Sequence, residues 1–376
     1  MNILFITPSE VQPLNGGIER ITASLAKVLQ EEYAYSCRFM NLVSGCSKEQ
    51  LGNEIKKQHI DIIIAQGADK RIANLLPTLR EIVDGLNRKV SLLFVFHSNP
   101  GVELATMDYG ALWNRILQGI DRKASLKQLG WQLVKPFVEK RMIAHLQKKY
   151  RVPYDYADKI VLLSKRFIPE YQSFSGGDVS HFLAIPNMLS FSEDTKPAEK
   201  KTKTVLLVSR MEERQKRIKL ALRIWNEVQH NGWQLKIVGA GEDLNYYKRL
   251  AKKWNVKDIS FEGRQNPLPY YQEASIFMMT SAFEGWGLTL TEAQQCGCVP
   301  IVFDTYASLP DIVTHKRSGI IVKEGDVDQY VTELQNLMGN SELLQELAKN
   351  AQKDCQRYTP QKVAEQWNKL FTELTK

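Results

Sequence analysis

Short, nearly continuous apolar segments recur along the chain and alternate with segments of helical periodicity. Runs of this length are typical of parallel strands that are buried on both faces. Their alternation with helical segments predicts parallel sheets covered by helices, which is an α/β fold. The apolar segments comprise residues 2–7, 61–67, 90–97, 158–164, 204–209, 235–239, 259–263, 276–281, 299–303 and 319–322.

A polar stretch divides this pattern into two blocks of similar size. Residues 188–203 contain SFSEDTKPAEKKTK and have the composition of a solvated linker. A chain of 376 residues is also long for one ordinary domain. We therefore predict one doubly wound domain over residues 1–187 and a second that begins at residue 204, with a cleft between them. Ligands of such sheets bind at the carboxyl ends of the strands, so the loops there matter most.

Residues 102–150 depart from the alternation, because they are helical in pattern and basic. An i, i+4 apolar stripe runs through Val134, Val138, Met142, Leu146 and Tyr150, and a similar one through Leu112, Ile116 and Ile120. One interpretation is a pair of helices packed on the first domain with a solvated basic face. The other is a surface over residues 112–150 that meets anionic lipid headgroups.

Two loops of the first domain are candidates for ligand binding. Gly16 and Gly17 lie between a strand and an amphipathic helix, where glycine lets the backbone approach a ligand and the helix N-terminus can bind phosphate. The alternative is a glycine pair needed only for turn geometry. His97 lies at the carboxyl end of the strand predicted over 90–97 and is either a structural residue or a residue of the cleft.

Two loops of the second domain also follow strands. Arg210 comes directly after a strand and Lys216 lies before the next helix, so the two could neutralise a diphosphate. Surface charge is the alternative, and it suits Arg214, Arg217 and Lys219. Gly239, in KIVGAGED, either relieves a tight turn or leaves backbone groups free for a base.

The segment SAFEGWGLTLTEAQQCG, residues 281–297, carries two acids eight residues apart in a glycine-rich turn that leads into a helix. Glu292 fits a capping box in which Thr289 is the N-cap, so that a structural explanation exists for it. Glu284 has no such explanation. Ionised carboxylates accept hydrogen bonds from hydroxyls, and a helix N-terminus binds phosphate. The segment therefore favours a ligand with hydroxyls on both sides of a diphosphate, which describes a nucleotide-sugar.

The spacing from Glu284 to Glu292 resembles the E-x7-E motif of retaining glycosyltransferases with the GT-B architecture, specifically the glycogen-synthase-like family 4. The resemblance covers nearly the whole chain in order: the GGIE loop, His97, IPN, the Arg210–Lys216 segment, VGAG, and EGWGLTLTEA followed by GCVPIV. It departs from the family where Ser98-Asn99-Pro100 follows the histidine and where Met188 replaces the usual glycine of IPNG. These departures leave the sugar and acceptor sides open.

The resemblance implies a role for each candidate residue. Arg210 and Lys216 would bind the donor diphosphate together with main-chain N–H groups around Gly287, Leu288 and Thr289, while Gly16 and Gly17 approach from the first domain. Glu292 would hold the ribose and Glu284 the transferred sugar. His97 would lie near the sugar and Arg264 against the base, and Gly239 is counted with the donor site. The first domain would be the acceptor side, residues 204–357 would bind the nucleotide-sugar, and residues 358–376 would form a helix that crosses back.

The resemblance predicts transfer of a hexose from a nucleotide-diphosphate-sugar, with UDP favoured, to a hydroxyl of a glycan or lipid-linked acceptor in the assembly of bacterial surface polysaccharide. No cofactor and no metal are expected, because the cations and the helix N-terminus offset the leaving charge. The only D-x-D, Asp326-Val-Asp328, reads as a helix cap. Alternatives on the same architecture are a nucleotide-sugar epimerase and an inactive nucleotide-sugar-binding subunit.

Composition narrows the classes of partner and the cellular location that the chain suits. A net charge of +8 favours an anionic partner, yet the basic helices lack the aromatic platform of a nucleic-acid-binding surface, so nucleic acid is not expected. The start of the chain reads as a strand, and no apolar run reaches the roughly 20 residues of a membrane span. Together with five cysteines that suit a reducing compartment, this predicts a cytoplasmic protein, with association at the inner face of the membrane as a possibility.

Overall fold

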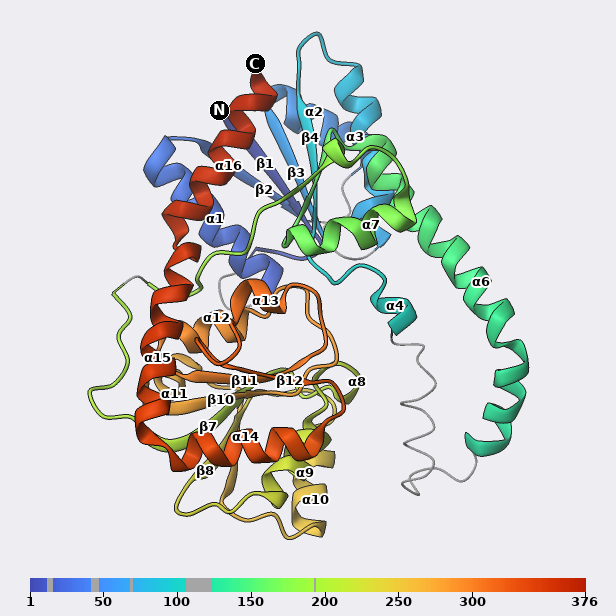
Figure 1. The fold of residues 1–376 in the computed structure, drawn as a ribbon. Coiled ribbons are helices and arrows are strands. Elements are labelled where there is room, and N and C mark those ends of the chain that lie inside the picture. Colours follow the sequence, from blue (N-terminus) through green and yellow to red (C-terminus); the bar gives the residue numbers. More distant parts are fainter. Residues whose placement is uncertain (12–15, 42–46, 68–69, 106–123, 193) are drawn as a thin grey trace. The chain divides into compact units, whose positions relative to one another are not determined.

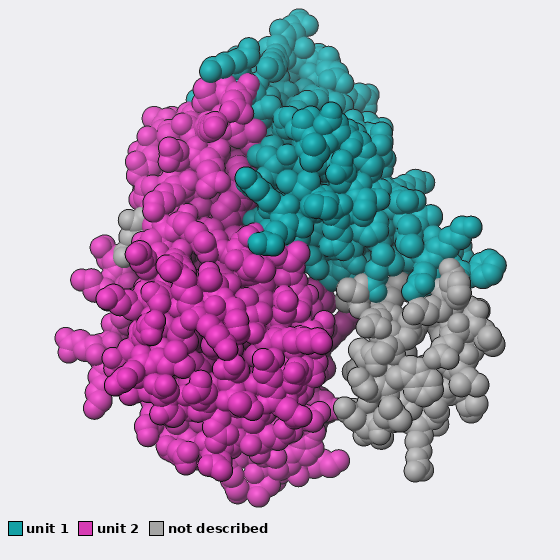
Figure 2. Space-filling view, viewed as in Figure 1, with its two compact units in different colours: residues 1–10, 36–184, 374–376 teal, residues 11–35, 185–373 magenta. Residues whose placement is uncertain are grey.

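The computed structural model of the protein describes residues 1–376 except 12–15, 42–46, 68–69, 106–123 and 193 (Figure 1). It contains two six-stranded sheets in which all the strand pairs are parallel, so the predicted α/β class with doubly wound sheets is confirmed. The chain divides into two compact units, coloured in Figure 2. The first comprises residues 1–10, 36–184 and 374–376, and the second comprises residues 11–35 and 185–373.

The sheet of the first unit has the order β2-β1-β3-β4-β5-β6. Every residue of β3 and β4 is buried, as expected for apolar strands with neighbours on both sides. The strands are β1 (Asn2–Thr7), β2 (Ser36–Asn41), β3 (Ile62–Gly67), β4 (Ser91–Phe96), β5 (Lys159–Leu162) and β6 (Phe182–Ala184).

Two strands of this sheet were not predicted, and both lie at its edges. β2 has the sequence SCRFMN, and none of its residues is fully buried, because one side of an edge strand has no neighbour. β6 is only three residues long. Neither has the continuous apolar run by which the central strands are recognised.

The helices of the first unit include a long helix in the basic region. α6 packs against α3 and α7, and Leu146 and Tyr150 of its apolar stripe are buried, while the upstream stripe over 112–120 lies outside the described residues. The helices are α2 (Lys48–Lys57), α3 (Lys70–Asp84), α4 (Val102–Ala105), α6 (Ala124–Tyr156), η2 (Lys165–Phe167), α7 (Ile168–Ser175) and η3 (Val179–His181).

The sheet of the second unit has the order β12-β11-β10-β7-β8-β9. Numbered from its own first strand, this is the 3-2-1-4-5-6 order of dinucleotide-binding folds, in which the strand order reverses between β7 and β10. The strands are β7 (Thr202–Val208), β8 (Gln234–Val238), β9 (Ile259–Gly263), β10 (Ala274–Met279), β11 (Val299–Asp304) and β12 (Ile320–Lys323). β7 thus begins inside the segment predicted as a linker, and the predicted domain boundaries remain predictions.

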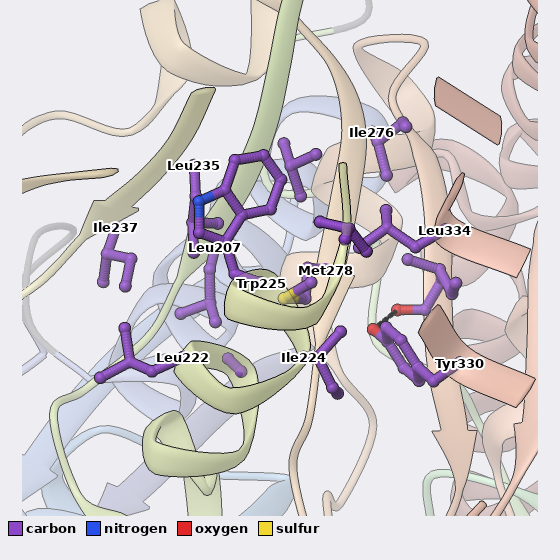
Figure 3. Close-up of a cluster of buried hydrophobic side chains, with 14 of the residues drawn as sticks. Leu207, Leu222, Ile224, Trp225, Leu235, Ile237, Ile276, Met278, Tyr330 and Leu334 are labelled. Atoms are coloured by element: carbon purple, nitrogen blue, oxygen red, sulfur yellow. Dashed lines mark hydrogen bonds between the residues drawn. The ribbon is translucent and has the colours of Figure 1, made fainter. Parts of the chain in front are cut away.

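The core of the second unit lies between this sheet and its helices. Trp225 is fully buried in a hydrophobic cluster that includes Leu207 and Ile237, and Tyr330 donates a hydrogen bond to the carbonyl of Ile301 at 2.7 Å (Figure 3). The helices are α1 (Gly17–Tyr33), α8 (Glu213–Lys216), α9 (Ile218–Glu227), α10 (Leu244–Lys253), α11 (Leu268–Glu273), α12 (Leu288–Gln295), α13 (Leu309–Ile312), α14 (Val327–Gly339), α15 (Ser341–Cys355), η4 (Gln356–Tyr358) and α16 (Pro360–Thr375).

α16 ends the chain as a single helix, within the predicted range of 358–376. Its Asn368 side chain hydrogen-bonds with the hydroxyl of Tyr35, and Phe371 packs against the same ring. The last three residues, 374–376, are counted with the first unit. The start of α14 confirms the predicted cap, since the Asp326 side chain accepts from the amide of Gln329.

Candidate functional site

A buried ion pair lies at the point where the strand order of the second sheet reverses. Lys216, at the end of α8, places its Nζ 2.5 Å from Oε1 of Glu284, which follows β10. The two side chains are only 12% and 10% exposed. β7 and β10 are neighbours in the sheet, so the loops that follow them begin side by side at this edge. The topology itself therefore brings the two residues together.

Gln215 connects this pair to Arg210. Its Nε2 lies 3.4 Å from the second carboxylate oxygen of Glu284 and 3.2 Å from the carbonyl of Phe283, while its Oε1 accepts from Arg210 at 3.1 Å. The Arg210 side chain is 73% exposed, so most of its guanidinium is available to a ligand. The sequence reasoning missed Gln215, although it lies next to Lys216 in the same basic loop.

Arg217 corrects one interpretation of this loop. The sequence suits surface charge at this position, but the Arg217 guanidinium donates to the carbonyls of Thr280 and Ser281 at 2.8 and 3.0 Å, and it pairs with Glu324 at 3.2 Å. Burial lowers the pKa of Arg217 below its usual value. The side chain therefore fixes the loop after β7 to the end of β10, which supports the placement of Lys216 beside Glu284.

The helix that follows Glu284 begins differently from the prediction. Gly287 is the N-cap of α12, with a positive φ of 88°, and no side chain caps the helix. A Cβ at Gly287 would lie 3.0 Å from the hydroxyl of Tyr306, so both conformation and space favour glycine. The capping box from Thr289 to Glu292 is therefore wrong, because the helix has already begun at Leu288. The first amides, of Leu288 and Thr289, have no acceptor within the helix and can receive an anion.

Glu292 consequently lies in the second turn of α12 and not in its first. Its side chain is 1% exposed, and Nη2 of Arg20 from α1 lies 2.6 Å from its Oε1. Tyr271 of α11 is also near: its pKa is raised well above the usual value by burial and then by the negative charge of Glu292. Arg20 and Tyr271 were not predicted, and the only signal in the sequence was a charged residue just after Gly16-Gly17.

Gly17, one of the two glycines before Arg20, is next to α12 as well. Gly16 is the N-cap of α1, and Gly17 is its first residue. A Cβ on Gly17 would lie 3.2 Å from the side chain of Leu288, and one on Gly16 would lie 2.6 Å from the carboxylate of Glu19. Gly17 therefore packs closely against the start of α12.

The glycines after β8 have a structural explanation. Gly239 has a φ of 138°, and a Cβ there would lie 1.8 Å from the carbonyl oxygen of Ser209. The adjacent Ala240 carbonyl accepts from the amide of Met211 at 3.0 Å, so the loops after β7 and β8 are in backbone contact. Close approach of these two loops therefore explains Gly239, and its part in the donor site stays a prediction. Arg264, directly after β9, is exposed, and its contact with a base remains a prediction.

His97 lies in the first unit, immediately after β4. Its Nε2 is 2.8 Å from Oε1 of Gln66, which is buried at the end of β3 and was not predicted. Burial lowers the pKa of His97 to about 4, so the imidazole is neutral near pH 7. A neutral imidazole beside an amide can exchange hydrogen bonds with hydroxyls but offers no charge.

The second unit therefore gathers Arg210, Gln215, Lys216 and Glu284 at the start of α12, with Glu292 one turn further. The described residues contain no group of three or more His, Cys, Asp or Glu side chains arranged to hold a metal ion. What the arrangement offers is positive charge and free amides for phosphate, next to carboxylates that accept from hydroxyls.

Comparison with known proteins agrees with this chemistry. Residues 191–354 match the family model described as glycosyl transferases group 1. The chain is 25% identical over 361 residues to an uncharacterized glycosyltransferase of Haemophilus influenzae, covering 95% of this chain and 96% of that protein. It is 26% identical over 227 residues to the amylovoran biosynthesis glycosyltransferase AmsD of Erwinia amylovora, covering 58% and 63% of the two chains.

A solved structure shows the same fold. HepE of Anabaena, crystallised in complex with UDP, aligns with a TM-score of 0.72 at 15% identity, over 99% of this chain and 100% of that one. The fold is thus the two-domain α/β architecture of GT-B proteins. Together with the group 1 match, it defines the class: the chain is a glycosyltransferase of the hexosyltransferase type, EC 2.4.

Proposed function

We propose that this protein is a retaining glycosyltransferase of family 4 that uses a UDP-sugar without a metal ion. The observation that carries the proposal is the ion pair of Lys216 and Glu284 beside the open N-terminus of α12. HepE, which has the same fold, was crystallised with UDP, and this supports UDP as the nucleotide.

The proposed donor site follows from the positions of the charges. Lys216 has three donors, of which Glu284 engages one, so the ammonium can contact phosphate and carboxylate together. Arg210 approaches the same phosphates with its exposed guanidinium, and the amides of Leu288 and Thr289 complete the site. Glu284 then accepts from hydroxyls of the transferred sugar, and Glu292 accepts from the ribose.

In the proposed reaction, the bond between the anomeric carbon and the diphosphate oxygen breaks, and the acceptor oxygen bonds to the same face of that carbon. The acceptor proton passes to a phosphate oxygen of the leaving UDP. Arg210, Lys216 and the start of α12 stabilise the negative charge that develops on the diphosphate, and such fixed charges are usually the largest catalytic contribution. These groups supply the positive charge for which other enzymes use a metal.

Arg210→Ala tests this donor site. We expect UDP, in the presence of EDTA, to raise the melting temperature of the wild type by mass action, and GDP and ADP to do so less. Because Arg210 is exposed, its replacement should leave the melting temperature without ligand unchanged and abolish most of the UDP shift. Arg223→Ala, which removes an exposed arginine paired with Glu227 on α9, is the matched control.

A wild type that is stabilised by none of the three nucleotides would contradict the proposal. Transfer of sugar in EDTA to a polysaccharide or lipid-linked acceptor, with the α-linkage of the donor kept, would distinguish the enzyme from an epimerase.

We further propose that the acceptor belongs to surface polysaccharide and that the enzyme works at the inner face of the membrane. The name of AmsD supports the first part. On α6, Phe137 is 82% and Ile143 39% exposed, next to the exposed cations Lys140 and Arg141. Exposed apolar and basic side chains together suit an anionic bilayer surface. Within the described residues, the helices are all too short or too polar to cross a bilayer.

Vesicle sedimentation tests this surface. The wild type should sediment with phosphatidylglycerol vesicles and not with phosphatidylcholine vesicles. The double variant Phe137→Ser with Arg141→Glu should stay in solution, whereas Arg249→Glu, the same charge reversal on α10, should sediment like the wild type. Equal sedimentation of all three proteins would disprove the role of α6.

A further inference from the structure

Two contacts one helical turn apart hold α1 along α12 in the second unit. The backbone of Gly17 faces the side chain of Leu288, so closely that a Cβ would lie 3.2 Å from it. Three residues further along α1, Arg20 reaches Glu292, four residues further along α12. Since residues three and four apart lie on one face of a helix, the two pairs form a continuous contact.

The Arg20–Glu292 pair is unlike the surface ion pairs of this protein. The carboxylate is 1% exposed and the arginine side chain 27% exposed, whereas both partners of Lys27 and Glu31 on the same helix are at least 60% exposed. A buried carboxylate without a cation is strongly unfavourable, so Arg20 balances the charge of Glu292. The nearby Tyr271 hydroxyl carries no charge and cannot replace it.

The pair also leaves binding capacity unused. Arg20 contacts one oxygen of Glu292 and the Tyr271 hydroxyl also interacts with this carboxylate, which has about four acceptor positions on its two oxygens. The Nε of Arg20 is buried and donates to no group among the described residues. A carboxylate with acceptor positions left over suits a pair of neighbouring hydroxyls.

We propose that Arg20 is a positioning residue of the ribose subsite: it balances the charge of Glu292 and orients this carboxylate so that it accepts from both ribose hydroxyls of the donor. This inference rests on the proposed function, in which Glu292 binds the ribose. It assigns to α1 a part in nucleotide recognition beyond the close approach of Gly16 and Gly17.

The test measures how strongly the protein discriminates UDP from 2′,3′-dideoxy-UDP, which lacks the two hydroxyls. Calorimetric titration of the wild type should show UDP binding at least about tenfold tighter, as expected for hydrogen bonds to a charged group. Arg20→Met should weaken the binding of UDP by about tenfold or more and leave the binding of the dideoxy nucleotide nearly unchanged. The ratio of the two dissociation constants should therefore fall toward one. Arg20→Lys, which keeps the charge, should recover most of it.

Two further variants complete the experiment. Glu292→Gln should lose the same discrimination as Arg20→Met. Lys27→Met removes a positive charge from the same helix at an exposed position and should bind both nucleotides like the wild type. Circular dichroism of each variant checks that it is folded.

The outcomes separate this inference from the proposed function. If Glu292→Gln loses discrimination while Arg20→Met keeps it, Arg20 has no positioning role. If Arg20→Met lost affinity for both nucleotides equally, Arg20 would have a general structural role, and this result would also overturn the inference. A wild type that binds none of UDP, GDP and ADP would instead overturn the proposed function, and the inference with it.

Discussion

The two sheets of this protein share an architecture but present different chemistry at the carboxyl ends of their strands. In the first unit, the ends of β3 and β4 carry Gln66 and His97, an amide and a neutral imidazole. In the second unit, the loops after β7 and β10 carry Arg210, Lys216 and Glu284. The fold provides loops at the same edge in both cases, and the side chains on them decide which ligand is suited.

This difference in side chains indicates which of the two sheets can bind a charged ligand. The second sheet offers two cations and a helix N-terminus, so it suits a diphosphate. The first sheet offers groups that exchange hydrogen bonds without a charge, which suits sugar hydroxyls. Two variants, one in each unit, would break or sharpen this comparison.

Lys216→Met should have the larger effect, because it leaves the carboxylate of Glu284 without its cation in a site that is about nine-tenths buried. Breaking a buried pair in this way costs about 3–5 kcal/mol in the free energy of unfolding. Chemical denaturation measures this cost, and a coupled transferase assay should show loss of most of the activity.

The double variant Lys216→Met with Glu284→Gln separates the two effects. It removes both charges, so much of the stability should return while activity stays low. If Lys216→Met were as stable as the wild type, the ion pair would not be the element that organises the charged edge of the second sheet.

His97→Gln should have the smaller effect, and it should depend on pH. In the unfolded chain a histidine takes up its proton near pH 6.5, whereas burial lowers the pKa of folded His97 to about 4. Between these values the unfolded state binds more protons, so His97 costs stability as the pH falls from about 6.5 to about 4.

The variant has no titrating group at this position, so its melting temperature should fall less over that range than that of the wild type. Near pH 7.5 the two proteins should differ little in stability. Thermal scans from pH 7.5 to pH 4 provide the measurement, and parallel curves for both proteins would show that the neutral imidazole of the first unit is not buried as described.

The sequence was most informative about the central strands and the loops that follow them. The apolar runs over β3, β4, β10 and β11 are visible because parallel strands buried on both faces need uninterrupted apolar sequence. β2 and β6 escaped prediction because edge strands tolerate polar residues and short lengths. Arg210, Lys216 and Glu284 could be selected because each follows a strand, which is where ligands bind in such folds.

The start of α12 shows where local pattern failed. Thr289 and Glu292 have the residue types and the spacing of a capping box, but the helix begins at Leu288 after a left-handed Gly287. Tyr306, about 20 residues further along the chain, fills the space beside Gly287, and no local rule contains that contact.

By itself, the sequence determined the α/β class, the order of the strand–helix units and the loops that carry the charged residues. These follow from periodicity and from turn chemistry, which are properties of neighbouring residues. Only the tertiary structure decided the partners: Lys216 with Glu284 across 68 positions, and Arg20 with Glu292 from another helix. Such pairs depend on which loops the sheet order brings together and on which charges become buried, and both arise only when distant segments pack.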